Sequence, residues 1–314
     1  KGAEIMEITA VRDLILEFAY YIAGAIFFLS AYYVYRSDSK TRIGTTLFWS
    51  LLGVIFTFGS YLPPLLVGIL LVVMAVLTVT KQVTTPSLHA VSEAVKEERA
   101  KRFGLWIFLP SLTLALVVVI LVYNVKGLGG QAPLVIGGLT ALVVALIMLR
   151  PKPKEVYDGT TQMILQMGVT IILPQLLAAL GIIFTKAQVG NLISTAVASV
   201  VPAENRLLGV VAYVLGMVIF TMIMGNAFAA FTVITAGIGI PFVFALGANP
   251  VVAGTLAMTA GYCGTLMTPM AANFNSMPAS LLEMKDPNGV IKQQVPVALA
   301  MIVLHIALIY FMAY

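Results

Sequence analysis

The segment GYCGTLMTPMAANFN, residues 261–275, places a proline and several polar residues inside a long apolar stretch of the chain. Pro269 lacks a backbone N–H, and its ring clashes with the carbonyl group four residues earlier, so a helix cannot pass through it unbroken. We expect residues 250–282 to form one membrane segment whose helix is broken from Gly264 to Pro269.

Four polar side chains surround this predicted break: Thr265, Thr268, Asn273 and Asn275. Discontinuous helices with free carbonyl and N–H groups form the substrate and ion sites of secondary transporters. A proline kink whose free carbonyl is satisfied by a threonine hydroxyl is the alternative, and it needs no ligand. Because the break, the asparagines and a second polar interruption lie within one part of the chain, we favour a binding site.

The composition predicts a protein that crosses the membrane several times. The chain has 314 residues, of which 60% are hydrophobic and 10% charged, whereas about a quarter of a soluble domain is charged. The basic residues occupy short loops and form no single patch, so we expect no nucleic-acid partner. The only cysteine is Cys263, and the two histidines, His89 and His305, lie far apart. No disulfide, cofactor or catalytic constellation is expected, and the chain is not predicted to be an enzyme.

Apolar runs long enough to cross the bilayer recur along the whole chain. The fold predicted from them is all-α and polytopic, with about eight transmembrane spans, one re-entrant helical hairpin and one broken helix. We take residues 1–12 as an N-terminal extension, 13–149 as scaffold-like spans and 150–314 as a transport-like region. The expected segments are 13–35, 43–58, 62–80, 104–124, 131–149, 160–185, 206–246, 250–282 and 296–314.

Residues 206–246 are too long for one span and are interrupted at Gly225-Asn226. Two full spans joined by a turn would account for the length, and so would a re-entrant hairpin whose tip stops inside the membrane. A turn exposed to water would carry charged or several polar residues, whereas this one has a single asparagine among Met, Gly and Ala. We therefore favour the hairpin, because irregular backbone at membrane depth occurs where it is buried in protein or lines a wet cavity.

These features give a predicted site for a small substrate. The late spans carry no Asp, Glu, Lys or Arg deep in the membrane, and proton coupling usually needs such a titrating group. Neutral amide, hydroxyl and carbonyl oxygens are ligands for Na⁺, which we expect as a coupling ion. The candidate substrate-binding residues are Gly225, Asn226, Gly264, Thr265, Thr268, Asn273 and Asn275.

Several stretches resemble a bacterial family regarded as the larger of two membrane subunits of a 5-oxoproline (pyroglutamate) transporter. They are GTTLFWSLLGVIFTFGSYLPP (44–64), GANPVVAG (247–254), the segment 261–275, and PASLLEMKDPNGVIK (278–292). The resemblance implies a bacterial inner-membrane protein with a smaller companion membrane subunit. It also implies a setting beside peptidases that release pyroglutamate.

More distantly, GANPVVAG and GTLMTP are similar to a pattern in the large membrane subunits of tripartite periplasmic transporters. Those proteins belong to the ion-transporter superfamily, whose fold has two inverted repeats, each with a hairpin and a broken helix. Here Met270 replaces the second proline of that pattern, and one such unit is evident. The companion subunit or a second copy of this chain would have to supply the other unit.

The expected function is therefore a subunit of a secondary active transporter that imports a small carboxylate with Na⁺ coupling. The resemblance implies that this carboxylate is 5-oxoproline. The alternative is a non-transporting scaffold or assembly subunit of a membrane complex, with the substrate site in the partner. Whether Asn226 and Asn273 share one cavity distinguishes the two hypotheses.

The distribution of Lys and Arg predicts the orientation of the chain in the membrane. Basic residues are concentrated in the loops at 36–42, 81–103 and 150–158, whereas the 124–131 loop has only Lys126. Because basic loops stay in the cytoplasm, we predict that these three loops face inward and that the N-terminus and 124–131 face outward. Cysteines introduced into each loop should report this through an impermeant thiol reagent. Labelling of a cysteine near residue 96 from outside would contradict the orientation.

Overall fold

The computed structural model describes residues 2–84, 93–199, 201–202 and 204–314. Every regular element in these ranges is a helix, as the sequence predicts for an all-α protein. The chain divides into two compact units, Lys1–Gly168 and Val169–Tyr314. The sequence placed a boundary at residue 150. In the structure the helix that begins at Pro153 packs on the first helix of the chain and so belongs to the first unit.

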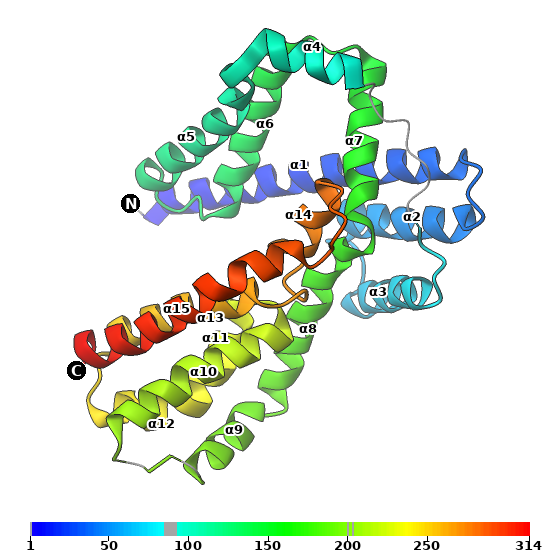
Figure 1. The fold of residues 1–314 in the computed structure, drawn as a ribbon. Helices are drawn as coiled ribbons and strands as arrows, with labels where there is room; N and C mark the ends of the chain where they lie inside the picture. Colours follow the sequence, from blue (N-terminus) through cyan, green and yellow to red (C-terminus); the bar gives the residue numbers. More distant parts are fainter. Residues whose placement is uncertain (1, 85–92, 200, 203) are drawn as a thin grey trace. The chain divides into compact units, whose positions relative to one another are not determined.

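The first unit pairs its helices along the sequence (Figure 1). Its elements are α1 (Gly2–Tyr35), α2 (Arg42–Phe58), α3 (Pro64–Val79), α4 (Glu93–Phe103), the 3₁₀ turn η1 (Gly104–Phe108), α5 (Leu109–Asn124), α6 (Gln131–Leu149) and α7 (Pro153–Met167). The helices α1 and α2 lie against each other, with the rings of Phe27 and Trp49 stacked at 5.8 Å between centroids. The helices α5 and α6 form a second pair, in which Gly137 leaves room for the backbone at Leu114.

The second unit folds residues 206–246 into two arms and breaks the segment 250–282 after Leu266. Each arm is long and apolar enough to cross a bilayer, so a two-armed hairpin is shown and its re-entrant character stays a prediction. The elements of this unit are η2 (Gly168–Ile172), at the boundary between the units, and α8 (Leu173–Lys186), α9 (Val189–Ala198), α10 (Arg206–Met224), α11 (Ala227–Ile234), the π-helical turn η3 (Thr235–Gly239), α12 (Ile240–Phe242), η4 (Phe244–Leu246), α13 (Pro250–Leu266), α14 (Ser276–Leu281) and α15 (Gly289–Met312). In Figure 1, α10, α11, α13 and α15 run side by side. Both α10 and α13 contact each of the other three helices.

The segment 206–246 folds back on itself as two packed antiparallel arms. Gly209 near the start of α10 lies against the carbonyl of Phe242 near the end of the second arm. One helical turn further along α10, the hydroxyl of Tyr213 lies 2.8 Å from that of Thr235. The contacts therefore run in opposite directions along the two arms, which defines a helical hairpin with its tip at Gly225-Asn226.

Small residues bring α13 close to α10. The buried face of α13 consists mainly of alanine and glycine, which let helix backbones approach closely in membrane proteins. At Gly264 a Cβ atom would overlap the carbonyl oxygen of Val218 on α10, whereas at Gly254 it would meet only the Phe231 ring, at 3.6 Å. Gly264, one of the candidate substrate-binding residues, thus lies inside α13 where this helix contacts α10.

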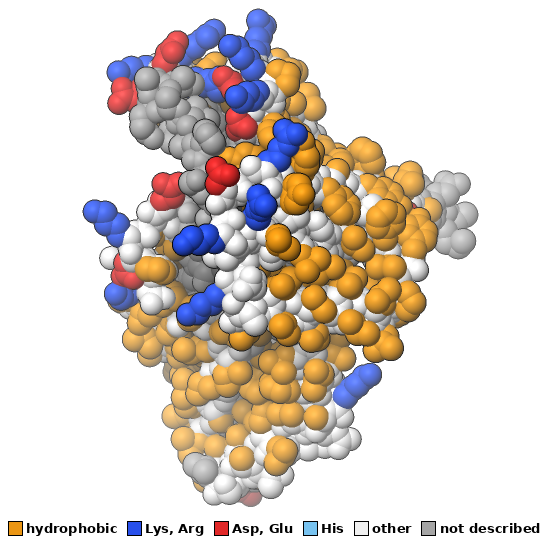
Figure 2. Space-filling model, turned by 90° about the vertical axis from the view of Figure 1, so that its right-hand side faces the viewer, with side chains coloured by type: hydrophobic (Ala, Val, Ile, Leu, Met, Phe, Trp, Pro, Cys, Tyr) orange, Lys and Arg blue, Asp and Glu red, His pale blue; other side chains and the backbone are white. Residues whose placement is uncertain are grey.

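The surface supports a membrane protein. Six helices in the described residues are long and apolar enough to cross a bilayer: Ile8–Tyr35, Glu97–Asn124, Gln131–Leu149, Arg206–Met224, Ala227–Leu246 and Gly289–Met312. On the face in Figure 2, hydrophobic side chains cover wide areas, and one group of charged side chains lies at the top of the view. Since α5 buries no residue although its sequence is almost wholly apolar, hydrocarbon is the surrounding that suits it.

Three segments differ from the sequence prediction. The expected span 160–185 is divided between α7 and α8, because Gly168 takes a positive φ of +55° and Pro174 follows in the first turn of α8. A separate apolar helix, α9, follows α8 after a bend of 66° and was not predicted. The predicted start of the break at Gly264 is wrong, since α13 continues to Leu266.

The Gly264 contact predicts a difference between two glycines of the same helix. Replacing Gly264 with alanine should force α13 away from α10 and destabilise the fold by about 1–3 kcal/mol, as overpacking does. The Gly254→Ala variant is the matched control, because its added methyl group meets only an ordinary contact. Thermal unfolding of both purified variants in detergent measures the difference. Equal melting temperatures would contradict the close approach.

Candidate functional site

The hairpin tip consists of Gly225, which ends α10, and Asn226, which caps the start of α11. Gly225 ends α10 in the left-handed conformation, with φ of +64°, which glycine adopts without steric cost. Asn226 begins α11, and its Oδ1 accepts hydrogen bonds from the backbone N–H groups of Phe228 (2.9 Å) and Ala229 (3.3 Å). Asparagine is among the preferred residues at this capping position. The side-chain nitrogen of Asn226 has no partner among the described residues, so it is free to donate.

The break that follows α13, after Leu266, lies directly against this tip. A Cβ atom on Gly225 would overlap the backbone carbonyl of Met270. The hydroxyl of Thr268 donates to the carbonyl of Met222 on α10 (2.8 Å) and accepts from the N–H of Met270 (3.2 Å). Thr268 therefore holds the break in place on the hairpin.

Asn275 holds the break together internally. This side chain is completely buried, and its Nδ2 donates to the carbonyls of Thr265 and Thr268, at 2.7 Å each. Those carbonyls lie at the end of α13 and in the break, where the helical hydrogen bonds stop. The Asn275 Oδ1 atom is buried without a partner, and so is the hydroxyl of Thr221 on α10. Unpartnered buried oxygens in a native fold call for an explanation, and a bound ion is one.

A cavity of about 270 Å³ lies between the hairpin tip and the break. Its volume is near the lower end of the range for small-molecule sites, roughly 300–1,000 Å³. Aromatic rings of Phe228, Tyr262 and Phe274 lie in successive edge-to-face contacts along it, with centroids 6.2 and 6.3 Å apart. The lining residues, none of which is charged, are Leu177, Gly225, Asn226, Ala227, Phe228, Tyr262, Thr265, Met270, Ala272, Asn273 and Phe274.

The seven candidate residues fall into two groups. Gly225, Asn226, Thr265 and Asn273 line the cavity. The other three, Gly264, Thr268 and Asn275, are absent from its wall and make the packing and hydrogen-bond contacts described above. Asn273 is exposed and makes no hydrogen bond to a described residue, so its amide is available to a ligand.

A second groove, of about 580 Å³, shares Asn226 and Phe228 with the first cavity. It continues along α8 over Gly181, Ile182 and Thr185 to Lys186, which carries the one charge among its lining residues. Sequence reasoning missed Lys186 because it follows the expected span 160–185 and reads as the start of a loop. Its position as the last residue of α8 was the available signal.

The described residues of this unit contain no cluster of side chains that would bind a metal ion. In the part of the chain that the structure describes, no group of three or more His, Cys, Asp or Glu side chains converges. The oxygens at the break come instead from backbone carbonyls, threonine hydroxyls and one amide. Such neutral oxygens suit a hard cation that binds without proton release.

The role of Asn275 predicts a contrast with its neighbour Asn273. An Asn275→Asp substitution replaces the donor to two carbonyls with an acceptor, so it should destabilise the fold by about 1–3 kcal/mol or more. The matched Asn273→Asp variant changes an exposed side chain and should stay within about 0.5 kcal/mol of the unsubstituted protein. Chemical or thermal unfolding in detergent compares them. A larger loss of stability in Asn273→Asp than in Asn275→Asp would contradict these assignments.

Comparison with known proteins gives one family. No curated protein and no solved structure matches the chain. Residues 17–314 match the family described as "Protein of unknown function (DUF979)". Since the match covers almost the whole chain, including the hairpin tip and the break, this protein belongs to the DUF979 family.

Proposed function

We propose that this chain is a subunit of a secondary active transporter that imports a small carboxylate across the bacterial inner membrane. The observation that carries the proposal is the cavity between Gly225-Asn226 and the break after Leu266. Two interrupted helical segments meet there, and interrupted helices in membrane proteins commonly form substrate sites. Polar backbone at membrane depth is tolerated where it lines such a cavity.

The walls of the cavity suit an anion with a small ring. The N-terminal end of α11, which carries the positive end of the helix dipole, contributes Asn226, Ala227 and Phe228 to the wall. The aromatic side chains supply apolar contact, and the amide of Asn273 offers a donor and an acceptor. The lactam of 5-oxoproline has one N–H and one C=O that an amide can match, and its carboxylate can face the helix N-terminus. We therefore propose 5-oxoproline as the substrate.

Lys186 gives the adjoining groove a positive charge. A carboxylate that approaches along this groove would meet Lys186 before it reaches Asn226 and Phe228, which line both spaces. A single basic residue at the mouth of a site raises the local concentration of anions. We propose that the groove is the route by which substrate enters.

Na⁺ is the coupling ion that the chemistry of the break favours. Its oxygens are neutral, and the unpartnered Asn275 Oδ1 and Thr221 hydroxyl are buried in the same unit. The residues that line the cavity include no Asp, Glu, His, Lys or Arg that could carry a proton during transport. Thr221, Thr268 and Asn275 are the residues of this chain that would contribute side-chain oxygens to a cation.

Transport is proposed to need a second subunit. The described residues contain one pair of a hairpin (206–246) and a broken helix (250–282), and a pseudo-symmetric transporter needs two such pairs. A smaller companion membrane subunit or a second copy of this chain would supply the other half. A non-transporting scaffold subunit remains the second candidate. The shared cavity of Asn226 and Asn273 favours the transporter, because a scaffold needs no free amides in a common wall.

The proposal predicts which substitutions abolish substrate binding. Asn226→Ser retains a side-chain oxygen that caps α11 but removes the free amide nitrogen, and Asn273→Ala removes the second amide. Each should weaken binding of labelled 5-oxoproline to the purified chain about ten- to hundredfold, as expected when a polar group of the bound ligand loses its hydrogen-bond partner. Binding should also be tighter in sodium chloride than in choline chloride. Scintillation proximity with purified protein measures both.

Asn191→Ala on α9 serves as the control, because this asparagine is exposed and lies outside both cavities. It should bind as the unsubstituted chain does. Normal binding by both site variants would move the site off this chain and favour the scaffold hypothesis.

A further inference from the structure

A carboxylate with two phenol neighbours interrupts the apolar surface of the first unit. Glu17 is the one acidic residue between Leu14 and Tyr35 of α1. Its Oε1 accepts hydrogen bonds from the hydroxyls of Tyr21 (2.8 Å) and Tyr61 (3.0 Å), which lie 3.2 Å from each other. None of the described Lys, Arg or His side chains forms an ion pair with Glu17. The cluster therefore has a negative charge without a compensating cation.

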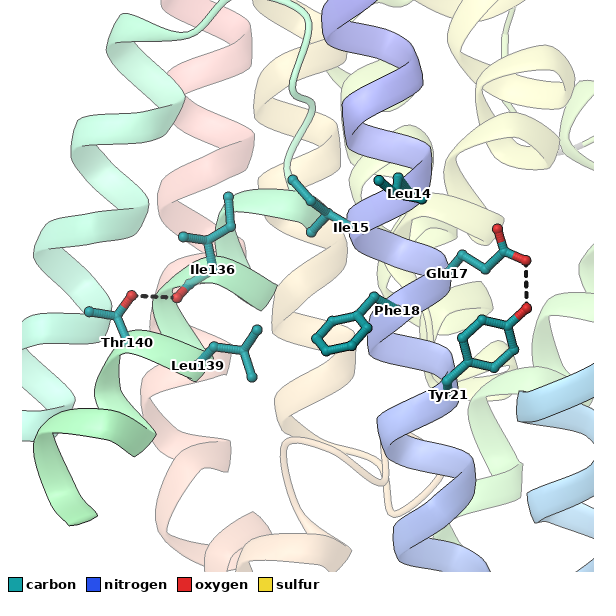
Figure 3. Close-up of a pocket in the computed structure, with 8 residues that line it drawn as sticks. All are labelled: Leu14, Ile15, Glu17, Phe18, Tyr21, Ile136, Leu139 and Thr140. Carbon is teal, nitrogen blue, oxygen red and sulfur yellow. Dashed lines mark hydrogen bonds between the residues drawn. The ribbon is translucent and has the colours of Figure 1, made fainter.

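An apolar groove of about 510 Å³ begins at this cluster. Figure 3 shows Glu17 and Tyr21 at one side of α1, Ile136 and Leu139 of α6 at the other, and Phe18 between them. Leu14 and Phe18 are among the exposed hydrophobic residues, 68% and 56% exposed. The hydroxyl of Thr140 donates to the carbonyl of Ile136 within α6, so it adds no free polar group. An acyl chain fits the chemistry of this groove.

The position of Glu17 along α1 matches the depth of the lipid headgroups. Arg12 lies near Gly129 in the turn between α5 and α6, at the end of both helices, and pairs with Asp13 at 2.7 Å. Glu17 follows Arg12 by about 7.5 Å along the helix axis, at 1.5 Å per residue. That distance is similar to the thickness of one headgroup layer, about 5–8 Å. Tyrosines are enriched at this level of the membrane.

We propose that the groove binds a phospholipid with a primary ammonium headgroup, phosphatidylethanolamine, whose ammonium contacts the Glu17–Tyr21–Tyr61 cluster. A primary ammonium has three N–H donors and no acceptor. The cluster presents three acceptors to it: the Glu17 carboxylate and the two phenol oxygens, each of which can accept while it donates to Oε1. The acyl chain lies over Phe18 and against Ile136 and Leu139.

The chemistry distinguishes this lipid from others of the bilayer. Phosphatidylcholine carries a quaternary ammonium without any N–H, so it forms none of these hydrogen bonds, although tyrosine rings can still attract its charge. Phosphatidylglycerol has a net negative charge and is repelled by Glu17. The groove therefore selects among lipids by the donors on the headgroup nitrogen, and the acyl chains contribute affinity without selectivity.

The test uses the full chain reconstituted in vesicles of equimolar phosphatidylethanolamine, phosphatidylcholine and phosphatidylglycerol. After extraction into mild detergent, native mass spectrometry counts the lipids that each protein retains. The unsubstituted chain should retain phosphatidylethanolamine about tenfold over phosphatidylcholine, the ratio expected for hydrogen bonds to a charged group. Glu17→Gln should reduce the ratio to about one, and Tyr61→Phe should lower it about two- to threefold.

Two further variants separate recognition from folding. Asp13→Asn removes a negative charge from the same helix, one turn away, and should keep the preference of the unsubstituted chain. Leu139→Trp fills the groove and should reduce the retention of all three lipids together. Equal retention of phosphatidylethanolamine and phosphatidylcholine by the unsubstituted chain would overturn the proposal. A basic side chain from a partner helix would then be the alternative partner of Glu17. An unchanged preference in Glu17→Gln would overturn the proposal as well.

Discussion

The second unit depends on one backbone contact, the approach of the Met270 carbonyl to Gly225. A side chain at position 225 would occupy the space of that carbonyl, so the tip of the hairpin and the break of the neighbouring helix can meet only at a glycine. The hydrogen bond from Thr268 to Met222 fixes the same contact from the other side. The cavity exists because these two interruptions are held next to each other, and each alone would be a simple kink or turn.

The polar residues of the site divide into those that build it and those that face the cavity. The Thr268 hydroxyl donates to the carbonyl of Met222 on α10, and the Asn275 side-chain nitrogen donates to two carbonyls at the break, those of Thr265 and Thr268. Asn226 uses its Oδ1 to cap α11 but keeps its side-chain nitrogen without a described partner, and the Asn273 amide makes no hydrogen bond to a described residue. This arrangement lets polar groups line a cavity in an apolar environment, since hydrogen bonds within the chain already satisfy the backbone around it. The first unit has a different character, with one carboxylate cluster at the edge of an otherwise apolar surface.

Much of the architecture follows from local rules that a sequence displays. Pro269 made the break predictable, and the Gly225-Asn226 pair made the turn between the two arms predictable. Proline and glycine affect the backbone within a few residues of their own position. The limits of the break were less accurate, since α13 continues through Gly264 and Thr265 to Leu266. The function of Asn275 was not predictable, because its partners come within reach only after the chain turns back. The helix α9 and the groove at Lys186 also depend on tertiary contacts and went unnoticed.

The central claim is that the tip of the hairpin and the break of α13 meet inside the membrane. A cryo-electron microscopy structure of the chain in lipid nanodiscs measures this directly, because the density of the headgroups marks the depth of each residue. The account predicts Asn226 near the middle of the bilayer, with the Met270 carbonyl against Gly225. A structure with Asn226 at the level of the headgroups would show an ordinary turn between two spans and contradict the account.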